Sequence, residues 1–165
     1  MDTLTRTRNH LPLTVLFISC VALLGACDSF KDFGDFYILD ATYATLDKAR
    51  EEGAIVRGWV PEHLPETATN VRERHSQDTN EGWGTYSFGD LDLSHFEKHW
   101  SHAQSAPLPG DPNRFHGEPT IDWWPGTFSD GFVFYRGIED GHFWLAVDKE
   151  KKIGYFWIEP QRTGA

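Results

Sequence analysis

Cysteine is nearly absent from this sequence of 165 residues. It occurs at Cys20 and Cys27, so residues 28–165 contain no thiol. This excludes disulfide bonds, a catalytic cysteine and thiolate metal ligands from that part of the chain. The sequence also lacks a phosphate-binding glycine loop, a dinucleotide fingerprint and a Gly-x-Ser-x-Gly nucleophile motif. These absences predict a protein without a cofactor.

Basic residues are scarce as well. The chain has 15 Lys and Arg against 25 Asp and Glu, a net charge of −10. The first 26 residues hold two arginines and one aspartate, so the remainder carries −11. Nucleic acids and anionic headgroups bind proteins through Lys and Arg. The charge balance therefore excludes nucleic acid as a partner.

The start of the chain has the order of a secretory signal. MDTLTRTRNH, which contains two arginines, precedes the apolar run LPLTVLFISCVALLGA. This run of 16 residues is shorter than the roughly 20 that a membrane-spanning helix needs. Its end, LLGAC, resembles the lipobox of bacterial lipoproteins.

The lipobox resemblance implies cleavage before Cys27 and attachment of diacylglycerol to its sulfur, usually with acylation of the new N-terminus. Acyl chains of this kind hold a protein on a bilayer. Asp28 resembles the inner-membrane retention signal of enteric bacteria. An ordinary secretion signal with an unmodified cysteine is the alternative. The expected organisation is a lipoprotein signal peptide at 1–26, an acylated tether at 27–36 and one globular domain at 37–165 that faces the periplasm.

Helical patterns occupy the first half of the globular part. TLDKAREEG (45–53) predicts a helix with Thr45 as its N-cap. DLSHFEKHWSHAQ (92–104) predicts a second helix, and a third is expected after Pro65, with Ala68 and Val71 facing inward.

Strand patterns fill most of the rest. The predicted strands are AIVRGWV (54–60), WGTYSFG (83–89), GFVFYRGI (131–138), HFWLAVD (142–148) and KIGYFWIE (152–159). The last three are joined by links short enough for hairpins. Residues 105–131, rich in Pro and Gly, predict a long irregular connection. We therefore expect a small α+β domain, in which a C-terminal antiparallel β-meander packs with one to three helices.

The stretch RERHSQDTNEGWG (72–84) is unusually polar. Asp78 and Asn80 favour a structural bend, because short polar side chains close turns through nearby backbone groups. The alternative is a recognition loop for a peptide or sugar, in which these two residues act beside aromatic walls and a guanidinium donor. Under that alternative the walls are Trp59 and Trp83 and the donor is Arg57 or Arg74.

Residues 58–83 also resemble a pattern, GWxPxxLPxxAT…DTNExW, of bacterial envelope proteins. The residues that carry it are Gly58, Trp59, Pro61, Leu64, Pro65, Ala68, Thr69, Asp78, Asn80, Glu81 and Trp83. The resemblance implies an envelope protein and no particular activity.

Two further groups of side chains have competing interpretations. Trp123 and Trp124 either cap the core or anchor a partner, because Trp is enriched at interface hot spots. His95, His99 and His102 fall on one side of the predicted helix, and a pair at i, i+4 can bind zinc, nickel or copper. A solvated helix face explains these histidines without a metal, and we favour it.

The sequence thus favours a lipid-anchored binding or interaction module without catalysis. Its expected partners are the bilayer, through Cys27, and an envelope protein or small ligand. Two alternatives remain, an envelope hydrolase that uses His75 and Asp78, and an inhibitor or immunity-type lipoprotein.

Overall fold

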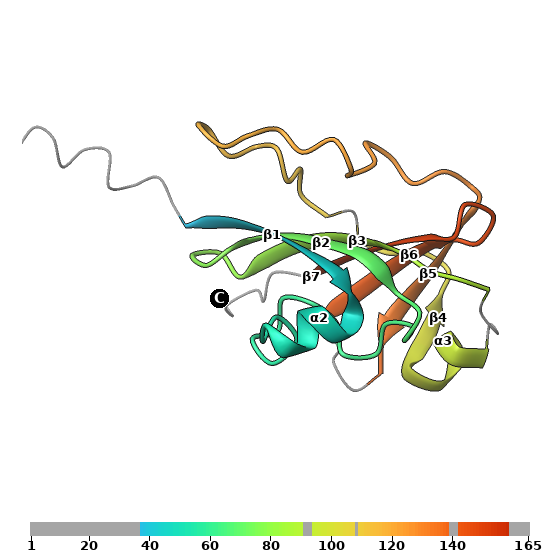
Figure 1. Ribbon diagram of the computed structural model, residues 1–165. Helices are drawn as coiled ribbons and strands as arrows, with labels where there is room; N and C mark the ends of the chain where they lie inside the picture. Colours follow the sequence, from blue (N-terminus) through green and yellow to red (C-terminus); the bar gives the residue numbers. More distant parts are fainter. Residues whose placement is uncertain (1–36, 91–93, 108, 139–141, 159–165) are drawn as a thin grey trace, which may run out of the picture. The chain divides into compact units, whose positions relative to one another are not determined.

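The computed structural model describes residues 37–90, 94–107, 109–138 and 142–158; Cys27, Asp28 and the expected signal and tether lie outside them. Within this part, seven antiparallel strands form one sheet, in the order β1-β2-β3-β7-β6-β5-β4 (Figure 1). The strands are β1 (Ile38–Thr45), β2 (Thr69–Ser76), β3 (Glu81–Ser87), β4 (Trp100–Ala103), β5 (Phe132–Gly137), β6 (Phe143–Asp148) and β7 (Ile153–Ile158). Two meanders, β1-β2-β3 and β4-β5-β6-β7, therefore meet where β3 pairs with β7.

The predicted α+β class is wrong, because the described residues are nearly all β. Their two helices, α2 (Leu46–Glu51) and α3 (Ser94–His99), have six residues each. The first agrees with the sequence, since Thr45 accepts a hydrogen bond from the Lys48 amide at 3.2 Å and caps α2. The C-terminal meander β5-β6-β7 is also confirmed.

The helix expected after Pro65 is instead strand β2. Ala68 and Val71 are three residues apart, a spacing that fits a helix. From Val71 onward, however, alternate side chains lie on opposite sheet faces, and β2 pairs with β1 on one edge and β3 on the other. Pairing along both edges overrides the weak helical pattern.

The helix expected at 92–104 stops at His99. From Trp100 the chain runs as β4 and pairs with β5, with Trp100 opposite Gly137. Residues 54–60, expected as a strand, form successive turns, because Gly53 and Gly58 adopt left-handed φ values of 78° and 77°.

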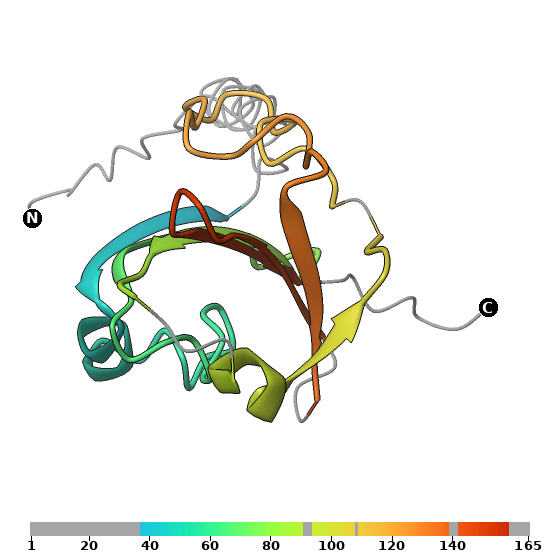
Figure 2. The same ribbon diagram turned by 90° about the vertical axis from the view of Figure 1, so that its right-hand side faces the viewer.

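The sheet is curved, and each face carries its own hydrophobic core (Figure 2). On the concave face, here called the inner face, lie α2, α3 and residues 52–68. Their buried side chains, among them Leu46, Leu64 and Phe96, pack on Val71, Phe156 and other strand residues. The inner face is therefore covered by residues 46–68 and by α3.

The opposite, outer face carries a cluster of tryptophans. Trp83, Trp157 and Trp144 lie on neighbouring strands in direct register, and the last two stack at an interplanar angle of 11°. The irregular stretches 104–107 and 109–131, which run along this side in Figure 1, place Trp123 and Trp124 against the cluster. Described residues that form no strand thus close the second core.

The turn between β6 and β7 is held by a carboxylate, here called the charged cap. The contribution of its charge to stability can be tested. The Asp148 carboxylate accepts hydrogen bonds from the amides of Lys151 at 2.9 Å and Glu150 at 3.1 Å. The Lys151 amide contributes most to holding the pKa of Asp148 below its ordinary value. We expect Asp148→Asn to reduce the free energy of unfolding by about 1 kcal/mol at neutral pH, because the Asn side-chain oxygen can still accept both bonds and only the additional strength of bonds to a charged group is lost.

The pH dependence of that difference follows from the sign of the shift. A carboxylate whose pKa is lowered by folding stabilises the fold above the pKa of the unfolded chain, and this stability is lost as pH falls through the lowered value. Urea denaturation of both proteins between pH 7 and pH 2 should show the gap closing at the acid end. A gap that is constant over this range would contradict the charged cap.

Candidate functional site

A cavity of about 320 Å³ lies where β3 begins and β7 ends. Its lining comes from three separate parts of the chain: the turn after α2, the β2–β3 turn, and the neighbouring ends of β6 and β7. The lining residues are Arg57, Gly58, Trp59, Asn80, His142, Phe143 and Ile158. The volume lies within the range of small-ligand sites, which combine apolar walls with few polar groups.

The turn at 53–60 is held by its own backbone. The amides of Arg57, Gly58 and Trp59 donate to the carbonyl oxygens of Gly53, Ile55 and Ala54, at 2.8–3.1 Å. Left-handed glycines at both 53 and 58 make this path possible, since other residues rarely adopt such φ values. Arg57 and Trp59 are therefore presented from a preformed turn.

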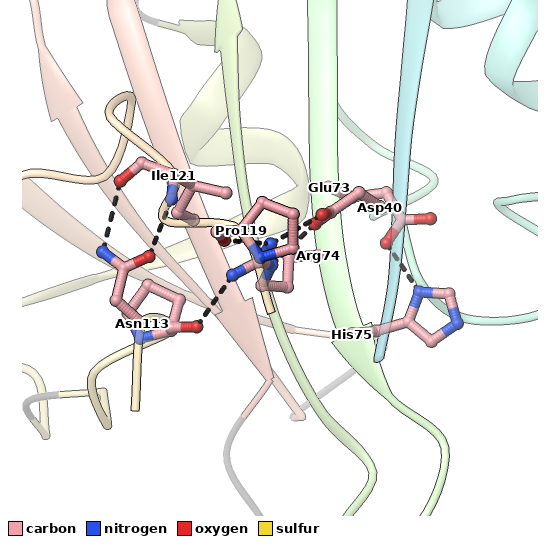
Figure 3. A network of polar contacts seen from close by, with 8 residues as sticks. Asp40, Glu73, Arg74, His75, Asn113, Pro119 and Ile121 are labelled. Carbon is pink, nitrogen blue, oxygen red and sulfur yellow. Dashed lines mark hydrogen bonds and ion pairs between the residues drawn. The ribbon is translucent and has the colours of Figure 1, made fainter. Parts of the chain in front are cut away.

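Trp59 is fixed from behind by a buried polar pair. Its ring stacks on the imidazole of His75, with centroids 3.8 Å apart and an interplanar angle of 11°. His75 Nδ1 lies 2.6 Å from Glu73 Oε2, and both residues are buried on the inner face (Figure 3). The carboxylate thus orients the imidazole, and the imidazole supports the indole that lines the cavity.

Arg57 is held by neutral oxygens. It donates to the Glu52 carbonyl oxygen at 3.0 Å and to the phenol of Tyr43. Burial raises the pKa of Tyr43, and the nearby Glu73 carboxylate adds to that rise. Tyr43 therefore remains a neutral acceptor for Arg57 throughout the physiological pH range.

Asn80 reaches the cavity from the β2–β3 turn. It adopts a left-handed φ of 53°, and the turn is closed by the Thr79 amide, which donates to Ser76 Oγ at 3.3 Å. The stretch at 76–80 is thus a hairpin bend, with a serine rather than Asp78 as the side-chain acceptor. Asp78 is exposed in the same turn and is not among the lining residues.

The remaining predicted residues lie on the other side of the sheet. Arg74 is fully buried under the irregular stretch 109–131, where its guanidinium donates to Asp40 and to the Pro112 and Pro119 carbonyl oxygens (Figure 3). Trp83 is buried beside it. Figure 3 shows Arg74 and His75 pointing in opposite directions from β2, as consecutive strand residues do.

The structure thus divides the predicted recognition residues into two groups. Arg57, Trp59 and Asn80 come together at the cavity. Arg74, Trp83, Trp123 and Trp124 belong to the outer-face core, and Trp124 packs edge-on against Trp157 and Tyr155. The cavity is the candidate site.

The three histidines considered for metal binding do not share a helix. His95 and His99 lie on α3 with ring centroids 6.1 Å apart, whereas His102 lies on β4 against Tyr135. His99 stacks on His63 at 4.0 Å. Within the described residues, no group of three or more potential metal ligands comes together, and no helix is long and apolar enough to cross a membrane.

Sequence reasoning missed Glu73, Tyr43 and the cavity residues His142, Phe143 and Ile158. The signal for the first was present: in RERH, Glu73 and His75 are two apart and share a face if the segment is a strand. Assigning a helix to this stretch concealed their pairing. His142, Phe143 and Ile158 have no local signal, because they reach the site through strand pairing with β3.

The described part of the chain belongs to the class of open antiparallel β-sheets. It has a ligand-sized cavity at one end of the inner face of the sheet. Residues 38–87 match the family model of the YbbD head domain. The match begins with the first residue of β1 and ends with the last residue of β3, so it contains the 53–60 turn and the Glu73–His75 pair. No curated protein and no solved structure matches the chain.

The matched range also contains every residue of the envelope-protein pattern at 58–83, and a YbbD head domain fits a bacterial envelope protein. The lipobox lies outside it and stays a prediction.

Proposed function

We propose that this protein is a lipid-anchored, periplasm-facing binding protein of the bacterial envelope, which holds a small ligand or the end of a larger partner beside Trp59. The observation that carries the binding role is the preformed turn at 53–60, which presents Arg57 and Trp59 to a 320 Å³ cavity. Rigid presentation lowers the entropy that a site loses on binding.

The envelope location rests on other observations. The YbbD head domain match fits an envelope protein. The anchor is proposed from the signal-like leader and LLGAC ending at Cys27, and Asp28 favours the inner membrane. The net charge of −10 supports a partner other than nucleic acid.

Photo-crosslinking in growing cells tests this function. A benzoylphenylalanine placed at His142, an exposed lining residue, should capture a ligand or partner of defined mass. The same group at Val56, which is 89% exposed and outside the lining, is the matched control. Cells fed an alkyne-bearing palmitate should label the wild type and leave Cys27→Ser unlabelled.

The outcomes separate the two parts of the proposal. A defined adduct from position 142 that is absent from position 56 supports binding at the cavity. Identical adducts from both positions, or none from 142, would contradict it. Palmitate on the Cys27→Ser variant would contradict the anchor.

A further inference from the structure

The chemistry of the cavity lining points to a particular class of ligand. Its polar residues, Arg57, Asn80 and His142, can all donate hydrogen bonds. Among the described residues, seven line the cavity and none of these is a carboxylate, although the chain carries 25 Asp and Glu. The described lining of the cavity therefore offers hydrogen-bond donors and no carboxylate, although the protein as a whole is acidic.

Arg57 keeps its positive charge available there. Its described contacts are with the neutral Glu52 carbonyl oxygen and Tyr43 phenol, and no carboxylate in the described residues forms an ion pair with it. Two bonds leave donors on a guanidinium that has five N–H groups. The buried carboxylate of Glu73 is bonded to His75 and is not among the described residues that line the cavity.

The rest of the lining is flat or apolar. Trp59 is half-buried and supported by His75 on one ring face, and Phe143 and Ile158 complete the wall. Aromatic walls of this kind pack against rings. Charge-assisted hydrogen bonds from Arg to a carboxylate are among the strongest that such a site can offer.

We infer that the cavity binds a carboxylate attached close to a ring, with the acid at Arg57 and Asn80 and the ring against Trp59. This inference rests on the proposed function and assigns its ligand class. A free ring acid and a chain end with a terminal carboxylate next to an aromatic side chain share this chemistry.

The test compares acids with their uncharged amides. Benzoate and benzamide represent the free acid, and acetyl-Gly-Gly-Phe as acid or amide represents the chain end. Each is titrated into the full-length protein in detergent micelles, and binding is read from the Trp59 indole N–H resonance, assigned with Trp59→Phe. At least one acid should bind tenfold or more tightly than its amide, and the pair that does so identifies the source.

Substitutions locate the charge. Arg57→Gln should remove the preference for the acid, whereas Arg50→Gln, which removes an equal charge from an exposed arginine on α2, should preserve it. Acid and amide binding equally at Trp59 would overturn the carboxylate class while leaving a binding cavity. An acid preference that survives Arg57→Gln would overturn the role of Arg57. If no probe moves the Trp59 signal, the ligand class is wrong, and the crosslink from position 142 still decides the proposed function independently.

Discussion

Asp40→Asn is expected to lower the free energy of unfolding by about 3 kcal/mol, because it leaves a buried guanidinium without its counter-charge. Arg74 is 0% exposed, and its Nε and a terminal nitrogen each lie 2.6 Å from an Asp40 carboxylate oxygen. Breaking a buried ion pair from one side costs roughly 3–5 kcal/mol. The Asp40 side chain is 45% exposed, which favours the lower end of that range.

The partner substitution, Arg74→Met, should lower the free energy of unfolding by less than Asp40→Asn does. The ranking of these two losses tests whether an unpaired buried charge is the main cost. Arg74→Met removes the buried charge, and water can solvate the Asp40 carboxylate left at the edge of the sheet. The Pro112 and Pro119 carbonyl oxygens lose a donor, so we expect a cost of about 1–2 kcal/mol. Urea denaturation measures both, with Arg72→Met at an exposed position of β2 as a control that should change stability little. A larger cost for Arg74→Met than for Asp40→Asn would contradict this account.

Gly84→Ala is expected to destabilise the fold by about 3 kcal/mol, or to prevent folding. Gly84 lies on β3 opposite Phe156 of β7, at the centre of the sheet, and an added Cβ would overlap the Phe156 ring. Overpacking a tight core usually costs about 1–3 kcal/mol, and here the obstructing atoms belong to a fully buried ring between paired strands. Thermal unfolding followed by circular dichroism measures the loss.

A second substitution keeps this prediction testable if the single variant does not fold. Phe156→Leu removes the ring, so adding Gly84→Ala to that background should cost much less than adding it to the wild type. Gly126→Ala is the control, since a Cβ there meets no atom within 4 Å. Equal costs in the two backgrounds would show that steric overlap with Phe156 is not the cause.

Local sequence signals predicted those parts of the fold that local interactions decide. Thr45 capping α2 is one such case, and the meander β5-β6-β7 is another, because short links bring its strands together. Residues 54–60, expected as a strand, and the stretch after Pro65, expected as a helix, were assigned incorrectly for two different reasons. Left-handed glycines bend the first stretch against its strand composition, and pairing on two edges straightens the second against its helical spacing.

The candidate site, too, could be predicted only in part. Trp59 and Arg57 stood out as an aromatic and a charged residue in an otherwise apolar stretch, and they do line the cavity. Arg74 and Trp83 stood out equally, yet they lie on the other face of the sheet. The face of the sheet on which each side chain lies can be assigned only if β2 is known to be a strand. Successive strand residues such as Arg74 and His75 then point to opposite sides of the sheet.

The junction of β3 with β7 has a consequence for how the chain folds. The hairpin β2-β3 and the meander β5-β6-β7 join strands that are close in sequence, and contacts of low sequence separation form quickly. The β3–β7 ladder, by contrast, joins residues far apart: Thr85 Oγ1 donates to the Gly154 carbonyl oxygen, 69 residues away. The contacts formed in the β3–β7 ladder must offset the conformational entropy that is lost when this long loop closes. Strand β3, with which the YbbD head domain match ends, is therefore also where the β2-β3 hairpin and the β5-β6-β7 meander must dock before the core around Gly84 can close.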